Sequence, residues 1–311
     1  MNILFLGGAK RVSMARMFIE AGQRLGHEVN IISYELETDV PIACVGRVVK
    51  GLKWSDSGLM DDLATLVKQE KITVMVAFVD AAVEVAARFC ATHRDVWSPV
   101  SDEKLCAVMF DKTLSAQLFE SLNLPVPATM SIGDGCFPKI AKPRRGSASK
   151  GIKVIMEAAD ETGLAEHSDD YLIQEYIAKS EEYTVDCYVD RQGEIVCAVP
   201  RRRLEVAGGE VTRSVTVDIP ELNRLSLSVL ERTGLRGAVT LQFLHDVTDD
   251  RWLLMEINPR LGGGAVCAVH AGANLPEYII RESLGLAIEP PAWDSGVEIT
   301  RYMQEVVFRK S

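Results

Sequence analysis

The chain of 311 residues lacks several features that mark common protein classes. It has no apolar run of about 18 residues, so a membrane-spanning helix is not expected. Its seven cysteines form no CxxC pair, which favours buried free thiols in a reducing cytoplasm over a zinc site. The formal net charge of −10 argues against nucleic acid as a partner, because a phosphate backbone is bound by a basic surface.

Two familiar nucleotide-binding loops are also missing. Residues 7–11 read GGAKR and lack the full GxGxxG spacing of dinucleotide-binding proteins. Glu35 nevertheless stands where an acid could bind a ribose, so a nicotinamide or flavin site is one alternative. In the other interpretation, the loop borders a substrate pocket or simply turns the chain. The GxxxxGK[ST] phosphate loop is absent as well, so a nucleotide needs a different phosphate cradle.

The first third of the chain alternates between strand and helix patterns. The N-terminus has no basic lead and runs directly into Gly7-Gly8, which predicts a buried strand and not a signal peptide. Strands are expected at 2–6, 29–33 and 73–78, and helices at 11–25, 56–70 and 81–90. This alternation predicts an α/β fold with a parallel, doubly wound sheet in a cytoplasmic protein.

A basic, glycine-containing loop follows in the middle of the chain. Asp111 is expected to cap a helix, and short strands are expected at 137–143 and 152–156. The loop between these strands contains Gly146 and Ser147, whose backbone N–H groups could donate to phosphate oxygens, while Lys142 supplies a point charge. A flap that closes over phosphates is one interpretation, and a solvated basic hairpin is the other.

Two further segments carry polar residues with alternative meanings. Residues 171–177 read as a strand whose backbone edge could bind a purine ring, with Glu182 taking the ribose hydroxyls, although exposed acids are usually only solvated. The run Arg201–Arg203, placed between strands at 194–200 and 211–217, is either solvated or binds an anionic substrate.

The segment 255–260, reading MEINPR, carries the most specific pattern. Glu256 and Asn258 point to the same face of a strand, and Gln242 lies on the preceding strand. Three such oxygen donors suit Mg²⁺, and Arg260 can make a bidentate contact with a phosphate or a developing anion. The alternative is a surface acid followed by a turn. Gly263 lies in a glycine run that allows close approach to a ligand.

In this order the motifs resemble the ATP-grasp enzymes, most closely a single ATP-grasp unit of the carbamoyl-phosphate synthase large subunit. The ligases that make lysine-type dipeptides look similar too. The resemblance implies a Rossmann-like domain over 1–110, a linker helix and mobile lid over 111–173, and an α+β core over 174–311. The chain is too short for the two fused units of a full synthase, and it has lysine at 112 and 142 where synthase units commonly have arginine.

The resemblance also implies a role for each matching residue. Lys112, Lys142, Gly146 and Ser147 would contact the ATP phosphates. Glu175, Tyr176 and Ile177 would line the adenine pocket, and Glu182 would bind the ribose. Gln242, Glu256 and Asn258 would hold Mg²⁺, or Mn²⁺ in its place. Arg260 would act with Lys142 in catalysis, and Arg201, Arg203 and Gly263 are candidates for the substrate site.

The expected activity is therefore ATP-dependent ligation of a small-molecule carboxylate and an amine or ammonia. An acyl-phosphate would form first, with release of ADP, and the amine would then displace phosphate. A bicarbonate-phosphorylating unit like that of carbamoyl-phosphate synthase is an alternative. A nicotinamide-dependent oxidoreductase and a non-catalytic nucleotide-binding protein are two others, and we allow for a homodimer.

Overall fold

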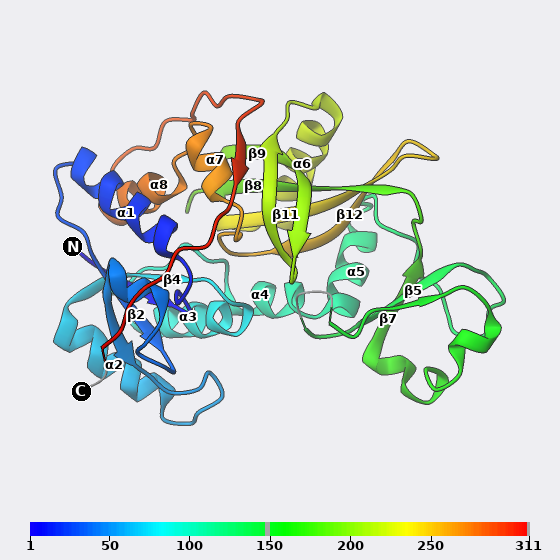
Figure 1. Cartoon of the computed structure of the whole chain (residues 1–311), viewed down its shortest axis with the longest axis horizontal. Helices are drawn as coiled ribbons and strands as arrows, with labels where there is room; N and C mark the ends of the chain where they lie inside the picture. The colour runs from blue at the N-terminus through cyan, green and yellow to red at the C-terminus, as the bar shows by residue number, and fades with distance from the viewer. Residues whose placement is uncertain (147–149, 310–311) are drawn as a thin grey trace.

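A computed structural model describes residues 1–146 and 150–309 of the chain (Figure 1). Its N-terminal part is a parallel sheet of four strands in the order β3-β2-β1-β4. The strands are β1 (Asn2–Leu6), β2 (Asn30–Glu35), β3 (Arg47–Lys50) and β4 (Ile72–Ala77). The helices are α1 (Val12–Arg24), η1 (Pro41–Cys44), α2 (Leu59–Glu70) and α3 (Asp80–Thr92). The predicted parallel, doubly wound sheet is confirmed.

The alternation along β1 explains why helices cover both faces of this sheet. Ile3 and Phe5 pack with α1 on one side, whereas Leu4 and Leu6 pack with α2 and α3 on the other. All four side chains are fully buried, as expected for a central parallel strand. β3 was not expected from the sequence, because charged residues at both ends of this short edge strand hide its apolar centre.

A small three-stranded antiparallel sheet, which we call the lid sheet, follows two linking helices. The helices are α4 (Glu103–Met109) and α5 (Lys112–Ser121). The lid strands are β5 (Lys139–Pro143), β6 (Lys153–Ile155) and β7 (Tyr171–Glu175), with η2 (Ala158–Glu161) and η3 (Ala165–Asp170) between β6 and β7. The expected capping role of Asp111 is confirmed, since its side chain accepts from the backbone N–H of Leu114 at 3.2 Å.

The largest sheet has six antiparallel strands in the order β12-β11-β8-β9-β10-β13. These are β8 (Ser180–Val189), β9 (Ile195–Ala207), β10 (Glu210–Thr216), β11 (Gly237–Asp246), β12 (Arg251–Asn258) and β13 (Glu298–Thr300). Its helices are α6 (Pro220–Thr233), α7 (Val266–His270) and α8 (Leu275–Ser283), and α8 packs against α1 (Figure 1).

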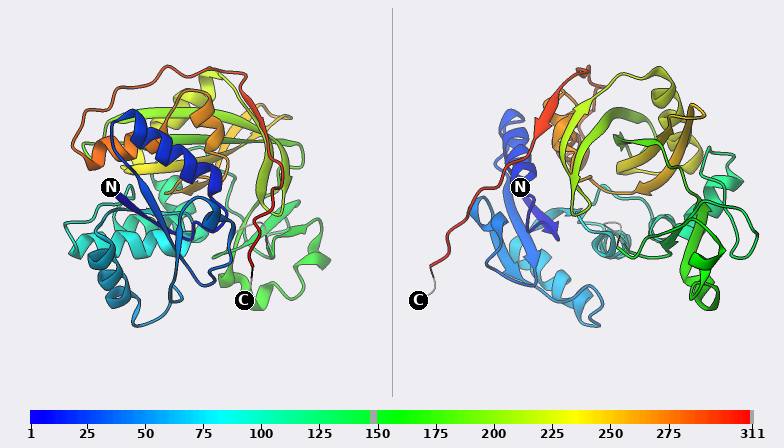
Figure 2. Two further views of the ribbon diagram at one scale, coloured as in Figure 1. Left: turned by 60° about the vertical axis from the view of Figure 1, so that its left-hand side comes forward. Right: turned by 45° about the vertical axis from the view of Figure 1, so that its right-hand side comes forward.

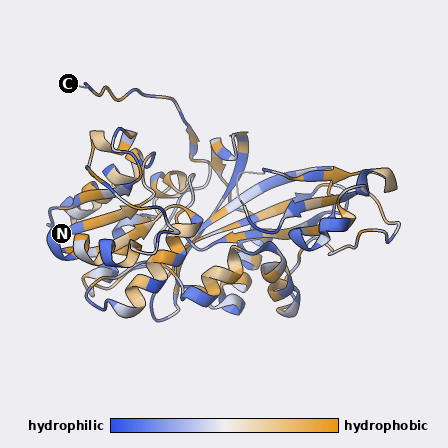
Figure 3. Ribbon diagram, turned by 90° about the horizontal axis from the view of Figure 1, so that it is seen from below, coloured by the Kyte–Doolittle hydropathy of each residue, from blue (hydrophilic) through white to orange (hydrophobic). Residues whose placement is uncertain are grey.

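Two expectations for this sheet were wrong in their bounds. Arg201–Arg203 lie within β9, not between two strands, because β9 continues far beyond Pro200 and pairs with β10. The sequence also predicts a closing strand over residues 298–307, but β13 has only three residues and pairs with residues 213–215. The following segment leaves the body of the molecule (Figures 2 and 3), with the Met303 side chain 96% exposed.

One face of the six-stranded sheet is apolar, and the other, which we call the polar face, is polar beside the lid sheet but apolar at Tyr188 and Val199, which belong to the core around α1. Figure 3 shows polar and apolar residues alternating along the strands. Val185 and Leu241 belong to a core that also includes α6. On the opposite face, Thr184 lies between Arg201 of β9 and Gln242 of β11, and Gln242 lies opposite Glu256 of β12. A period of two therefore directs polar side chains from four strands into one layer.

None of the helices in the described part of the chain has the length and apolar character needed to cross a membrane.

Candidate functional site

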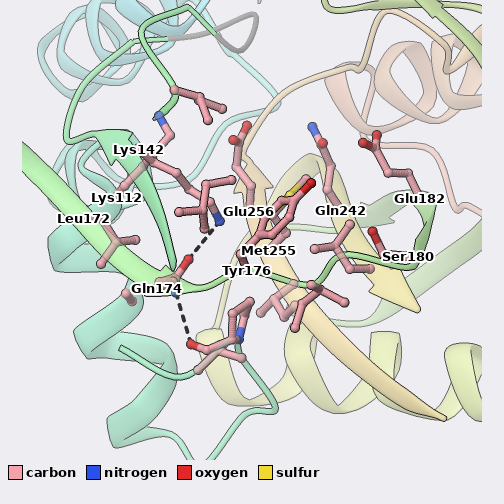
Figure 4. A pocket seen from close by; sticks show the side chains of 18 of the residues that line it. Lys112, Lys142, Leu172, Gln174, Tyr176, Ser180, Glu182, Gln242, Met255 and Glu256 are labelled. Carbon is pink, nitrogen blue, oxygen red and sulfur yellow. Dashed lines mark hydrogen bonds between the residues drawn. The ribbon is translucent and has the colours of Figure 1, made fainter. Parts of the chain in front are cut away.

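A cavity of about 390 Å³ lies between the lid sheet, α5 and the polar face of the six-stranded sheet (Figure 4). Its volume is in the range that holds a small-molecule ligand. Apolar side chains from all three parts form one portion of the wall: Phe119, Val126, Ile140, Leu172, Leu244, Leu254 and Met255. Predicted site residues form much of the rest: Lys112, Lys142, Gly146, Glu175, Tyr176, Ile177, Glu182, Arg203, Gln242 and Glu256. The fold thus brings together residues that are widely separated in the sequence.

Lys142 lies on β5 and is buried beside the cavity, with 7% exposure. Its Nζ donates to Oε1 of Gln174 on β7 at 2.8 Å, and Gln174 in turn donates to the backbone oxygen of Pro127 at 3.2 Å (Figure 4). Burial, aided by the charge of Lys112 and opposed by that of Glu256, lowers the pKa of Lys142 to about 8. An anion that enters the cavity would therefore lie near a buried amine that can gain or lose a proton around pH 8.

Lys112 connects α5 with the start of the basic loop. It is the first residue of the helix, and its Nζ donates to the backbone oxygen of Gly146 at 2.7 Å. Asp111, next to it, accepts from Nε of Arg144 at 2.7 and 2.8 Å. These contacts hold the near end of the loop against the helix. The predicted contact residue Ser147 lies outside the described residues.

The residues expected around adenine and ribose occupy the opposite part of the cavity. The carboxylate of Glu175 binds Arg251 at 3.1 and 3.3 Å and accepts from the backbone N–H of Ala128 at 2.9 Å. The backbone N–H of Glu175 also donates to the carbonyl of Ala128 at 2.9 Å, so neither its carboxylate nor its N–H is free for a ligand. Glu182 forms an ion pair with Arg203 at 2.9 Å.

The proposed metal donors come from two adjacent strands. Gln242 and Glu256 are direct cross-strand partners, and Figure 4 shows their polar ends pointing to the same side as that of Glu182. Nδ2 of Asn258 donates to Oε1 of Glu256 at 2.6 Å, and Oδ1 of Asn258 accepts from Arg260 at 3.1 Å. Oε1 of Gln242 accepts from Arg203 at 3.2 Å. To bind a metal, the amide oxygens of Gln242 and Asn258 would have to give up their hydrogen bonds with Arg203 and Arg260.

This donor set fits Mg²⁺ that is also bound by phosphate oxygens. One carboxylate and two amide oxygens are hard ligands, and Mg²⁺ in nucleotide sites is commonly held by one or two carboxylates together with phosphates and water. Within the described residues, no cluster of three or more His, Cys, Asp or Glu side chains could hold a metal by itself. The site therefore suits a metal that arrives with a nucleotide.

Arg260 joins the six-stranded sheet to the N-terminal sheet. It follows β12, and its Nε donates to Oδ1 of Asp80 at 2.9 Å. Asp80 is the first residue of α3, just after β4, at the strand end where doubly wound sheets bind ligands. Arg260 and Asn258 do not line the cavity themselves, but they extend the polar layer from Glu256 toward the N-terminal sheet.

The predicted substrate residues have different surroundings. Arg203 lines the cavity, but Arg201 is 3% exposed and its Nε donates to the fully buried Asp186 at 2.7 Å. The backbone of Gly264 lies over this pair, since a Cβ there would be 2.5 Å from Cζ of Arg201. The carbonyl of Gly263 accepts from Arg301.

Glu35, the acid considered for a dinucleotide, is bound within its own sheet. It accepts from Oγ of Ser33 at 2.6 Å and from the backbone N–H groups of Gly8 and Ala9. Burial raises the pKa of this carboxyl group above its usual value. The contacts give Glu35 a role in shaping the loop after β1.

Comparisons with known proteins identify the fold. A family model described as "ATP-grasp in the biosynthetic pathway with Ter operon" matches residues 167–305. The biotin carboxylase domain of the Hydrogenobacter thermophilus 2-oxoglutarate carboxylase superposes with a TM-score of 0.74 at 16% identity, covering 91% of this chain and 69% of that one. The N5-carboxyaminoimidazole synthetase of Staphylococcus aureus gives 0.75 at 15% identity, covering 94% and 79%. The chain has the ATP-grasp fold.

Curated relatives match shorter regions. The alpha subunit of mitochondrial methylcrotonoyl-CoA carboxylase from Arabidopsis thaliana is 23% identical over 167 residues, which are 48% of this chain and 23% of that protein. Biotin carboxylase 1 of Bacillus subtilis is 23% identical over 212 residues, or 62% of this chain and 44% of that protein. The matched regions thus amount to less than half of either relative. The likeness to carbamoyl-phosphate synthase stays a prediction from the sequence.

Both structural neighbours are described with a bound nucleotide. The H. thermophilus domain is described as a dimer in complex with MgADP, ADP and bicarbonate, and the S. aureus synthetase as a complex with ADP.

Sequence reasoning missed two residues of this candidate site. Gln174, the acceptor for Lys142, lies one position before Glu175 and faces the cavity, as the period of two along β7 could have indicated, because its neighbour Ile173 belongs to the lid core. Asp80, the partner of Arg260, could have been found from its position between a buried strand and a helix.

Proposed function

We propose that this ATP-grasp protein is an Mg²⁺- and ATP-dependent ligase that joins a carboxylate to an amine or ammonia. The observation that carries the proposal is the cavity itself, where the buried amine of Lys142 faces the oxygen donors Gln242 and Glu256 across a nucleotide-sized space. A bound triphosphate requires a cationic side chain on one side and oxygen atoms that bind its metal on the other.

The nucleotide base would occupy the apolar portion of the cavity. The purine would lie among side chains such as Leu172, Leu254 and Met255 and hydrogen-bond the backbone from Glu175 to Ile177. Glu182 would accept from the ribose hydroxyls, exchanging its present ion pair with Arg203 for them. The phosphates would then extend toward Lys112, Lys142 and the basic loop.

The metal would be held by Gln242, Glu256 and Asn258. When bound with the nucleotide, Mg²⁺ neutralises phosphate charge and helps to fix the γ-phosphate for in-line transfer. Arg203 and Arg260 now bind the two amide oxygens and would be released to contact phosphate or substrate oxygens.

The chemistry needs no nucleophile from the protein. The substrate carboxylate would attack the γ-phosphorus, forming an acyl-phosphate and ADP, and the amine would then attack the acyl carbon and expel phosphate. Lys142 would stabilise charge on the transferred phosphoryl group, and Arg260 would stabilise the oxyanion of the tetrahedral intermediate. Closure of the lid sheet would exclude water, to which an acyl-phosphate is unstable.

Bicarbonate is a second candidate for the activated carboxylate. It is favoured by the relatives, which include biotin carboxylases and a neighbour described with bicarbonate bound. ADP release that depends on bicarbonate, without any organic carboxylate, would identify this reaction. A homodimer, as described for that neighbour, stays a proposal that sedimentation of the purified protein would test.

The experiment that tests the proposal measures ADP release from Mg·ATP with panels of carboxylates and amines. We expect one pair to stimulate release, and Glu256→Gln to lower the turnover by about a hundredfold or more, because the only carboxylate among the metal donors is lost. Glu181→Gln is the matched control, since Glu181 lies on the opposite side of β8 and binds Tyr183 and Arg202. Binding of NADH with no ADP release from any pair would contradict the proposal.

A further inference from the structure

Three arginines from distant parts of the chain surround the glycine run that follows β12. Arg260 precedes the run, and Arg301 donates to the carbonyl of Gly263. Nη1 of Arg11 would be 3.1 Å from a Cβ placed on Gly263, so that guanidinium lies close against the backbone of the glycine run. The side chains of Arg11 and Arg260 are both 16% exposed, and that of Arg301 is 30% exposed. Such a concentration of partly buried guanidiniums favours an anion.

Arg11 and Arg301 already hold one carboxylate between them. Arg11 donates to Oε1 of Glu210 at 3.4 Å, and Arg301 donates to Oε2 of the same group at 3.2 Å. The two guanidiniums are therefore spaced to bind the two oxygens of a single carboxylate. Glu210 follows the turn between β9 and β10 and is 45% exposed, so its ion pairs are screened by solvent and readily exchanged.

The arginine pair lies next to the reacting end of the proposed nucleotide site. A chain of hydrogen bonds runs from Arg260 to Asn258 and on to Glu256. A carboxylate placed at Arg260 for activation would therefore have the Arg11 and Arg301 guanidiniums nearby, around Gly263, and the charge of Arg260 acts on Arg11.

The start of α1 adds a further preference for negative charge. Arg11 is the residue before this helix of 13 residues, whose first turn has no acidic side chain and no side-chain cap. The N–H groups at a helix N-terminus favour an anion, and here the same segment delivers the Arg11 guanidinium.

We propose that Arg11 and Arg301 bind a second carboxylate of the substrate, which displaces Glu210, so that the ligase acts on a dicarboxylic acid. The inference rests on the proposed function and specifies its substrate class. One carboxylate is activated beside Arg260, and the other replaces Glu210 between the two guanidiniums. In the free protein the side chain of Glu210 binds Arg11 and Arg301, so it competes with the substrate carboxylate for these two residues.

Displacement of Glu210 also has a consequence for the nucleotide cavity. Val206 and Gly209, at the tip of the β9–β10 hairpin, line that cavity, and Glu210 is the next residue. The dicarboxylate and the nucleotide therefore contact adjacent positions of one hairpin, so their binding is expected to be coupled.

The test compares the binding of a panel of dicarboxylates and their monoamides to the Mg·ADP-loaded protein by calorimetry. Arg301→Gln should weaken the binding of the preferred dicarboxylate by about tenfold or more and leave its monoamide nearly unchanged. Glu210→Gln should act in the opposite direction and tighten dicarboxylate binding, because the competing carboxylate is removed. Arg213→Gln, on the same strand as Glu210 but paired with Glu298, should have no effect.

Two results would overturn the inference. One is a Glu210→Gln protein that binds the dicarboxylate no better than the unchanged protein does. The other is equal binding of dicarboxylates and monoamides in the unchanged protein. If ADP release were then stimulated by monocarboxylates, the proposed ligase function would stand while the dicarboxylate inference failed. Tight dicarboxylate binding without any ADP release would instead support the anion site and contradict the ligase function.

Discussion

In the proposed site, Lys142 would make nucleotide binding sensitive to pH. Its pKa is lowered to about 8, chiefly by burial, so above that pH the amine of the free protein is neutral. A bound triphosphate favours the charged form and would raise the pKa again, which means that binding takes up a proton above pH 8. We expect the dissociation constant of Mg·ATP to be flat below the pKa and to rise by up to about tenfold per pH unit above it.

Calorimetry in buffers with different ionisation enthalpies measures both the affinity and the proton uptake. Lys142→Arg is the control, because a guanidinium stays charged throughout this range and should abolish the pH dependence. An affinity of the unchanged protein that is the same on both sides of pH 8 would contradict the assignment of Lys142 to the phosphates.

The sequence predicted the positions of the polar side chains better than their partners. The period of two along β12 correctly indicated that Glu256 and Asn258 share a face, where their side chains are hydrogen-bonded, because strand alternation is a local property. The pairing of Arg260 with Asp80 could not be read in this way, since the two residues are 180 positions apart and meet only when two sheets pack together. Arg301 gave no local signal at all.

At the scale of elements, the lid sheet depends on one buried lysine. Lys139 of β5 is fully buried, and its Nζ lies 2.6 Å from both Asp134 and Glu161. The hydrogen bond from Lys139 lowers the pKa of Asp134 to about 2, so this acid is ionised at neutral pH. The apolar core of the lid has only four buried residues: Ala141, Ile155, Leu164 and Ile173. Besides the strand pairings and the partly buried apolar side chains around this core, the ion pairs of Lys139 are the main polar contacts described within the lid.

Lys139→Met should therefore destabilise the lid selectively. Removal of one member of a buried ion pair typically costs about 3–5 kcal/mol, because the remaining charge is left buried. We expect faster hydrogen exchange over β5 to β7, unchanged exchange in the N-terminal sheet, and weaker ATP binding. Lys153→Met is the matched control, since Lys153 is an exposed lid lysine that contacts the ring of Tyr171. Exchange that changes equally in both variants would contradict this role of Lys139.

The elements themselves were largely predictable, apart from the edges of sheets. Central strands such as β1 are continuous apolar runs, and the C-terminus of α6 was marked by Gly234, which has a φ of 68°. The edge strand β3 is short and partly exposed, so its sequence carries little of the hydrophobic pattern that marks a strand, whereas β13 was expected but ends earlier than predicted. The length of β9 was missed because a run of three arginines resembles a loop.

At the scale of the whole molecule, the contact between Asp80 and Arg260 joins the two larger sheets at the candidate site. Asp80→Asn should lower the turnover by about tenfold with little change in ADP affinity, because Arg260 loses its charged partner but the nucleotide cavity is untouched. Steady-state kinetics and ADP titration separate the two effects. Glu103→Gln, which removes an exposed ion pair with Arg88, should change neither, and an equal loss of ADP affinity in Asp80→Asn would contradict the assigned role.

The order of sheets along the chain was predictable as a whole, whereas the substrate was not. Alternation of strand and helix indicated the parallel N-terminal sheet, and many residues that line the proposed nucleotide cavity lie on strands, whereas Lys112 and Phe119 come from α5. Arg11 comes from the first loop and Arg301 from the last strand end, so the anion site between them exists only in the folded chain.

The transfer of oxygen-18 from the substrate carboxylate tests the central claim most directly. The carboxylate that stimulates ADP release is labelled in both oxygens, and the phosphate released during amide formation is analysed by mass spectrometry. An acyl-phosphate mechanism predicts that one labelled oxygen passes into each phosphate, because the carboxylate oxygen that attacks the γ-phosphorus leaves with it. Phosphate without label, formed together with the amide, would contradict activation of the carboxylate by ATP at this site.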